Sequence, residues 1–152
     1  MDSGNSLTHI SELVAELFLA IKLIAGYPAP AAPPVIHLLG RAEIQQALCK
    51  GPCGDIKAYY IPERGVFINA ALDLDGDLLA RSVLLHELVH HVQSLSGRFE
   101  NIVSQCDRWY SKELEAYEVQ NEYLRINNNS RRFILEALPN MCKDGMTLKA
   151  PE

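Results

Sequence analysis

The sequence predicts a single α+β domain in which a small twisted sheet packs on helices. Long helical patterns occur near the N-terminus and in the second half of the chain. Between them lies a stretch with the turn residues of a β-hairpin. The 152 residues, 48% of them hydrophobic, are enough to bury one modest core. We therefore expect one domain over residues 1–152.

The N-terminal segment 7–24 is predicted to be an amphipathic helix. Its apolar residues recur at the spacing of a helix that packs on a core, and they are Leu13, Val14, Leu17, Phe18, Ile21 and Ile24. Glu12, Glu16 and Lys22 interrupt the segment, so it is too polar to span a membrane. The proline-rich residues 27–34 cannot continue the helix and are predicted to form an extended connector.

Shorter elements and two further helices are predicted for the rest of the chain. Residues 35–39 have the apolar run of a buried strand, and residues 41–49 favour a short helix. Residues 56–72 predict a hairpin, because the central Pro-Glu-Arg-Gly supplies the fixed and the positive φ angles of a tight turn. Near the C-terminus, helices are predicted at 106–125 and 131–138.

A long helix is predicted for residues 78–96. Asp75 or Asp77 is its expected N-cap, and Gly97 is expected to end it. On a helical wheel the core face of this helix consists of Leu84, Leu85, Leu88, Val89, Val92 and Leu95.

Charge and composition exclude some classes of function. The net charge is −5 and no cluster of lysines and arginines occurs, which argues against a general nucleic-acid binder. The first residues lack the cationic stretch and the cleavage site of a signal peptide. No pattern in the sequence indicates an oligomeric state.

Four cysteines, an even number in a small domain, predict two disulfides. We predict that Cys49 pairs with Cys53, and that Cys106 pairs with Cys142 and so ties the C-terminal segment to the body. Free cytoplasmic thiols and a four-cysteine zinc site are the alternatives. The disulfides favour a secreted or periplasmic protein whose signal peptide has been removed, and the cytoplasm is the other compartment considered.

The apolar run at 83–93 contains three histidines and one glutamate. On the helical wheel His86 and His90 fall within about 40° of each other beside the core face, so both imidazoles can reach a single point. Glu87 lies roughly 60° beyond His90, near enough to face a water bound to a metal there. His91 points about 100° away from the pair and is predicted to be a surface or packing residue.

The five residues HELVH match the pattern H-E-x-x-H and resemble the active-site helix of zincin metallopeptidases. The resemblance implies that His86 and His90 bind Zn²⁺ and that Glu87 takes a proton from the zinc-bound water. Gln93 and Ser96 stand where the metzincin pattern has glycine and histidine, which excludes that class. Gluzincins instead take a glutamate ligand from a downstream helix, and this short chain resembles a minimal, minigluzincin-like member.

The downstream helix offers four glutamates, which are Glu113, Glu115, Glu118 and Glu122. Glu113 lies near the middle of the apolar face, where an ionised carboxylate is costly unless it is paired or binds a metal. The other three lie together on the opposite face, where solvation explains them. Glu113 is therefore the predicted third ligand. If the gluzincin segment is aligned on its Glu-Ala-Tyr triplet, Glu115 becomes the ligand instead.

Tyr117 stands where that gluzincin segment often has an aspartate that supports a zinc-binding histidine. A tyrosine can form a hydrogen bond, but it supplies no negative charge to orient an imidazole. Tyr117 is also a candidate to stabilise the developing oxyanion. The other candidates for that role are Tyr59, Tyr60, Tyr110 and Tyr123.

Together these residues predict a zinc-dependent metallopeptidase acting on a peptide or protein substrate. In zincins an edge strand binds the substrate backbone, and the resemblance makes residues 66–72 the candidate. Two alternatives remain open. One is a non-catalytic binding module with the zincin fold and a structural zinc. The other is a latent peptidase whose first helix or proline-rich segment covers the cleft.

Overall fold

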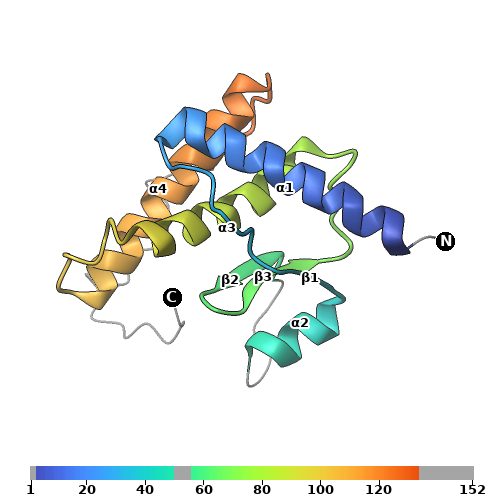
Figure 1. Ribbon diagram of the computed structural model, residues 1–152, viewed down its shortest axis with the longest axis horizontal. Coiled ribbons are helices and arrows are strands. Elements are labelled where there is room, and N and C mark those ends of the chain that lie inside the picture. Colours follow the sequence, from blue (N-terminus) through green and yellow to red (C-terminus); the bar gives the residue numbers. More distant parts are fainter. Residues whose placement is uncertain (1–2, 50–55, 134–152) are drawn as a thin grey trace.

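The computed structural model describes residues 3–49 and 56–133 and has a mixed α+β fold (Figure 1). The described part contains four helices and one three-stranded sheet, which confirms the predicted α+β class. In chain order the elements are α1 (Ser3–Ala25), β1 (Ile36–Leu39), α2 (Arg41–Leu48), β2 (Ala58–Ile61), β3 (Gly65–Asn69), α3 (Leu78–Ser96) and α4 (Gln105–Ile126).

The sheet has the strand order β1-β3-β2. Strand β3 pairs in parallel with β1 and antiparallel with β2, so the prediction that residues 66–72 form an edge strand is wrong. The hairpin of β2 and β3 follows from its local turn. The pairing of β1 with β3 joins segments about 30 residues apart, which a strand pattern does not reveal. The edge strand that contacts α3 is β2.

Gly65 begins β3 at a position where only glycine fits. Its φ is 106°, and a Cβ added there would lie 2.2 Å from the carbonyl oxygen of Val35. That oxygen accepts a hydrogen bond from the backbone N–H of Val66 at 2.9 Å. The glycine of the predicted turn therefore also allows the chain before β1 to approach β3 closely.

Helix α3 is the central element of the fold. Figure 1 shows it between α1 and the sheet, and α4 packs along it. Side chains from these elements form one apolar core, which includes Leu17, Phe18, Ile21, Tyr60, Val66, Ile68, Leu84, Leu85, Leu88, Val89, Val92, Ala116 and Val119. Leu95 was predicted to belong to this core but is 62% exposed, because the last turn of α3 extends beyond Val92, its last core residue.

Both ends of α3 are where the sequence places them. Asp77 is the N-cap, and its carboxylate accepts a hydrogen bond from the backbone N–H of Leu79 at 2.9 Å. Gly97 ends the helix with a φ of 66°, and its N–H donates to the carbonyl oxygen of Gln93 at 3.2 Å. The caps fix the bounds of the helix that carries the HELVH residues.

Some predicted features lie partly or wholly outside the described residues. Residues 131–133 are not helical, so the last predicted helix does not begin at 131, and its remaining residues are not described. Cys49 and Cys106 are disulfide-bonded, and no described cysteine is free. Their predicted partners, Cys53 and Cys142, lie outside the described residues, so the pairing stays a prediction. Within 3–49 and 56–133, no helix is long and apolar enough to cross a membrane.

Replacing Leu88 with alanine should lower the free energy of unfolding by about 2–5 kcal/mol, because a fully buried leucine leaves a cavity when it is truncated. The same change at the exposed Leu95, on the same helix, is the matched control and should cost less than about 0.5 kcal/mol. Denaturant unfolding followed by circular dichroism measures both values. Equal losses would mean that α3 presents a different face to the core.

Digestion of the unreduced protein followed by mass spectrometry should recover Cys49 linked to Cys53 and Cys106 linked to Cys142. Only three residues separate the first pair in the sequence, and both described cysteines are oxidised in the structure. A peptide in which Cys49 is linked to either of the other two cysteines would contradict this pairing.

Candidate metal centre

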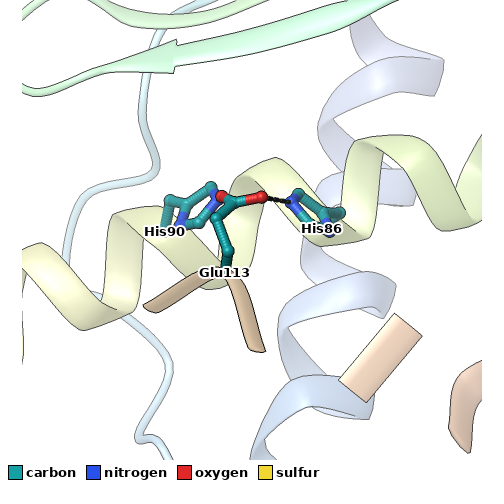
Figure 2. Close-up of side chains that lie close together, drawn as sticks. All are labelled: His86, His90 and Glu113. Carbon is teal, nitrogen blue, oxygen red and sulfur yellow. Dashed lines mark ion pairs between the residues drawn. The ribbon is translucent and has the colours of Figure 1, made fainter. Parts of the chain in front are cut away.

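His86 and His90 project from one face of α3, and Glu113 reaches them from α4. Figure 2 shows the Glu113 carboxylate between the two imidazoles. Nε2 of His86 lies 3.4 Å from one carboxylate oxygen, and Nε2 of His90 lies 2.5 Å from the other. One ligand atom from each of the three residues lies within 4.8 Å of the other two. The three predicted ligands therefore form one buried group that could hold a metal ion.

The charge of Glu113 is compensated within this group. The side chain is buried in the contact between α3 and α4, where an unpaired carboxylate would be costly. Burial alone would raise its pKa, but hydrogen bonds to His86 and His90 and their charge outweigh that effect and lower the pKa of Glu113 well below its usual range. The group therefore contains a carboxylate that stays ionised.

The second nitrogen of each imidazole contacts a buried glutamine. Nδ1 of His86 lies 3.0 Å from Oε1 of Gln120, and Nδ1 of His90 lies 2.9 Å from Oε1 of Gln93. An amide oxygen only accepts hydrogen bonds, so each Nδ1 is the donor. This leaves Nε2 of each ring directed at the Glu113 carboxylate.

The protonation of the two imidazoles bears on whether the site fits a metal ion. A neutral imidazole that is protonated on Nδ1 carries a lone pair on Nε2, and a carboxylate oxygen carries lone pairs as well. Such atoms repel one another unless a proton or a metal cation lies between them. Tetrahedral ligands bound to zinc at about 2.0–2.1 Å lie about 3.3 Å apart, close to the 3.4 Å between His86 and Glu113. The donor set and the spacing of His86 and Glu113 fit a metal ion, whereas His90 and Glu113, at 2.5 Å, are in direct hydrogen-bond contact.

Glu87 lies beside the ligand group, between α3 and the edge strand β2. Its carboxylate lines the same cavity as the three ligands and is hydrogen-bonded by the backbone of Tyr60. Burial raises the pKa of Glu87, although the charges of His86 and His90 act in the opposite direction. A raised pKa makes the carboxylate a stronger base than an exposed glutamate. Glu87 is thus placed to exchange protons next to the ligands.

A partly open cavity of about 380 Å³ adjoins the ligand group. Apolar and aromatic side chains make up most of its wall, a common property of sites that bind organic ligands. Besides the ligands and Glu87 it is lined by Ile56, Lys57, Ala58 and Tyr59 at β2, Leu79 and Val83 on α3, Trp109, Tyr117 and Gln120 on α4, and Phe133.

Tyr117 lies in this cavity but does not support a histidine through a hydrogen bond. Its ring packs on His86, with ring centres 4.4 Å apart, and on Phe133 at 5.3 Å. Nδ1 of His86 is occupied by Gln120 instead. Burial and the nearby carboxylates raise the pKa of Tyr117, so its hydroxyl keeps the proton that a donor to an oxyanion needs.

Only some of the five tyrosines that are candidate oxyanion donors line the cavity. Tyr59 and Tyr117 line it. Tyr60 and Tyr123 pack against the core, and Tyr110 is not among the lining residues that the structure describes. Two of the five predicted tyrosines therefore stay candidates.

Glu115, the alternative third ligand, lies apart from the ligand group. Its carboxylate accepts hydrogen bonds from the Tyr27 hydroxyl, from Nε2 of Gln93 at 3.0 Å and from Arg98 at 3.1 Å. The Arg98 guanidinium also lies 4.2 Å from the centre of the Tyr27 ring. Glu115 of α4 therefore links Tyr27, in the segment after α1, to Gln93 of α3.

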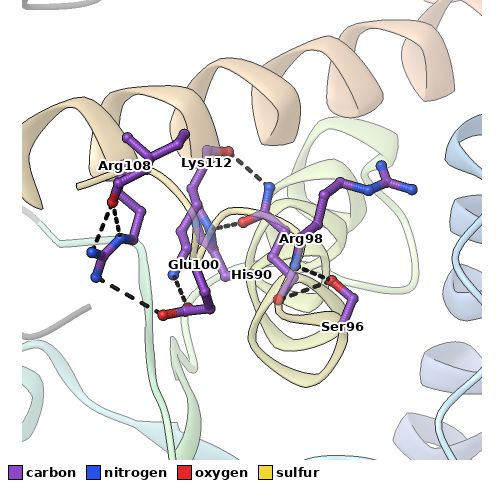
Figure 3. Close-up of polar contacts among 8 residues, drawn as sticks. His90, Ser96, Arg98, Glu100, Arg108 and Lys112 are labelled. Carbon is purple, nitrogen blue, oxygen red and sulfur yellow. Dashed lines mark hydrogen bonds and ion pairs between the residues drawn. The ribbon is translucent and has the colours of Figure 1, made fainter. Parts of the chain in front are cut away.

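Polar contacts hold the loop between α3 and α4 (Figure 3). Glu100 lies 3.9 Å from Arg108 and 4.0 Å from Lys112, and Arg108 donates to the carbonyl oxygen of Ile102 at 2.9 and 3.1 Å. The carbonyl oxygen of Lys112 accepts from Gln93 of α3 at 3.0 Å. These contacts hold the first turns of α4, up to Lys112, which directly precedes the candidate ligand Glu113.

His91 packs against hydrophobic neighbours and is not part of the ligand group, as the sequence predicts. Its ring lies 5.6 Å from that of Tyr60 and 6.1 Å from that of Phe18, between centres. The Tyr60 hydroxyl lies 3.1 Å from its Nδ1, and burial lowers the pKa of the imidazole.

Sequence reasoning missed the two glutamines. Gln93 served only to exclude the metzincin pattern, and Gln120 was not considered. A signal existed, because Gln93 follows His90 by one turn and Gln120 follows Glu113 by two turns on the same buried face. Gln93 contacts His90 within α3, whereas Gln120 reaches His86 only through the packing of α4 on α3.

Comparisons of this chain with protein-family models, with curated proteins and with solved structures find no match. Its function is therefore argued from the chemistry of the site.

Replacing Glu113 with glutamine should weaken zinc binding by at least about 100-fold, because it removes the one anionic ligand, a larger loss than the about 10–100-fold typical of residues behind the ligands. Glu115→Gln, two residues away, keeps one acceptor oxygen for Tyr27 and Gln93, gives up only the acceptor for the half-exposed Arg98, and should still bind about one zinc per chain. Elemental mass spectrometry after dialysis against a weak chelator measures both. Loss of zinc only in the Glu115 variant would reverse the assignment.

Proposed function

We propose that this chain is a small zinc-dependent metallopeptidase with a minimal gluzincin-like site. The proposal is supported mainly by one arrangement: two imidazoles and a carboxylate meet at one point, beside a partly open cavity that also contains Glu87. This combines the pattern HELVH with the downstream glutamate that the resemblance to gluzincins implies.

The donor set favours zinc over the common hard cations. Imidazole nitrogen is a good ligand for zinc, whereas magnesium and calcium prefer oxygen ligands throughout. His86, His90 and Glu113 would hold the ion, and three protein ligands are the number typical of catalytic zinc sites. When bound, zinc supplies a Lewis acid that lowers the pKa of water and polarises a carbonyl group.

The chain's own residues carry the proton transfers. Glu87 takes a proton from the attacking water as the water oxygen forms a bond to the carbonyl carbon of the peptide. When the carbon–nitrogen bond breaks, Glu87 delivers this proton to the leaving nitrogen, which departs as a free amine. The hydroxyl of Tyr117 or Tyr59 donates a hydrogen bond to the carbonyl oxygen as negative charge develops on it.

The substrate is a peptide segment that lies along β2. This strand pairs only with β3 among the described strands, and the residues at its start line the cavity next to Glu87. Backbone groups of an edge strand can pair with an extended peptide, while the apolar cavity receives a side chain. The role first assigned to residues 66–72 thus passes to β2.

The cavity also bears on the two alternatives to an active peptidase. Structural zinc sites are closed by four protein ligands, whereas here three ligands adjoin an open cavity, which favours catalysis. A latent peptidase would need α1 or residues 27–34 over the cleft. None of the described residues that line the cavity comes from either segment, so the structure offers no support for latency by this route.

Glu87→Gln should reduce peptide hydrolysis by at least about 100-fold, because it removes the proton acceptor while keeping the size of the side chain. Zinc content should stay near one per chain, since Glu87 is not one of the three ligands. Cleavage of a mixed peptide library, followed by mass spectrometry, measures activity. A chelator should stop cleavage by the unaltered chain, and added zinc should restore it.

Glu118→Gln is the matched control, because Glu118 is exposed on α4 and lines no part of the cavity. It should cleave the same peptides at the rate of the unaltered chain. Full activity of the Glu87 variant would remove this residue from the mechanism. Zinc-loaded protein that cleaves nothing in the library would favour the binding module.

A further inference from the structure

Two buried hydrogen-bond chains extend from the ligand histidines to backbone carbonyl groups. We propose that Gln120 and Gln93 are positioning residues, which fix the tautomers of His86 and His90 so that each presents an unprotonated Nε2 to the metal. The inference rests on the proposed zinc site. It assigns a role to two residues that the sequence pattern does not single out.

The hydrogen bonds behind His86 run in one direction in the structure. The hydroxyl of Ser82 donates its single hydrogen to the carbonyl oxygen of Leu79 at 2.6 Å. Its oxygen can then only accept, and it accepts from Nε2 of Gln120 at 3.1 Å. The opposite end of the amide, Oε1, therefore faces Nδ1 of His86, which has to carry the proton.

The chain behind His90 is fixed more strongly. Nε2 of Gln93 donates to the carbonyl oxygen of Lys112 at 3.0 Å and to the Glu115 carboxylate at 3.0 Å. Both partners only accept hydrogen bonds, so the amide cannot turn over without placing two acceptors against each other. Its Oε1 therefore faces Nδ1 of His90, which donates.

The two chains differ in whether they can be reversed. A hydroxyl can rotate, so Ser82 can turn from the Leu79 carbonyl and donate to position 120 instead. A carbonyl oxygen and a carboxylate have no hydrogen to offer at position 93. A carboxylate is therefore compatible with position 120, whereas position 93 needs a side chain that both accepts and donates.

This difference predicts how a change from amide to acid acts at each position. A carboxylate behind a ligand histidine strengthens the imidazole as a ligand. Glu at 120 can do this once Ser82 donates to it. Glu at 93 would place a second carboxylate beside Glu115 or would have to take up a proton, and both outcomes are unfavourable in a buried site.

The experiment compares Gln120→Leu, Gln120→Glu, Gln93→Leu and Gln93→Glu with the unaltered chain. Gln105→Leu is the control, because Gln105 is exposed at the start of α4, on the same helix as Gln120. Competition with a chromophoric zinc chelator gives the zinc affinity. Thermal unfolding of the zinc-free proteins gives the loss of stability separately.

Both leucine variants should bind zinc about 10–100-fold more weakly. Gln120→Glu should restore or exceed the affinity of the unaltered chain, by up to about 10-fold, with little change in unfolding temperature. Gln93→Glu should not recover the affinity, and its zinc-free form should unfold at least about 3 °C lower. The control should match the unaltered chain in both measurements.

Equal affinities in the leucine variants and the unaltered chain would overturn the inference, as would Gln93→Glu behaving like Gln120→Glu. A long-range ¹H–¹⁵N spectrum of the zinc-loaded chain that shows zinc on Nδ1 of either histidine would also overturn it. These outcomes leave the zinc site standing. If the unaltered chain binds no zinc, the proposed function fails first and the inference fails with it.

Discussion

The contact of one buried carboxylate with two imidazoles, across the interface of α3 and α4, is the interaction on which the candidate site depends. Glu113 is ionised inside an apolar contact between helices, and such a charge is tolerated only when it is compensated. His86 and His90 compensate it from the facing helix. Any shift of α4 along α3 would separate these groups and leave the charge unpaired.

A layer of buried polar side chains extends this constraint beyond the ligands. Gln120 connects His86 to Ser82 by hydrogen bonds. Gln93 connects His90 to the Lys112 carbonyl oxygen and the Glu115 carboxylate of α4. A layer in which every group has its partner favours one alignment of two helices over its neighbours, because a slip leaves several groups unsatisfied at once. An interface of leucines alone would tolerate such a slip more easily.

The same helix serves the core and the chemistry. One face of α3 packs on α1 and the sheet with fully buried aliphatic residues, and the neighbouring face carries the histidines. Because the apolar core holds α3 rigidly, the imidazoles sit on a fixed support, which precise ligand geometry requires. Strand β2 lies against α3 beside Glu87, so a single packing arrangement positions the candidate ligands, Glu87 and the edge strand together.

The α+β class, the helix that carries HELVH and both of its caps could be predicted from the sequence. These features are local: the spacing of His86 and His90 follows from the pitch of one helix, and Asp77 and Gly97 act within a single turn. Glu113 could be chosen over Glu115 because a carboxylate in the middle of an apolar face needs a partner.

Other features were decided only by the tertiary structure. The central place of β3, the exposure of Leu95 and the contact of His86 with Gln120 depend on which segments meet across the fold. A periodic pattern gives the face of a helix or strand but not the distant residue opposite it. The sequence by itself determined which residues can bind a metal, whereas the packing of α4 on α3 decided which of them meet, because that contact joins residues far apart in the chain.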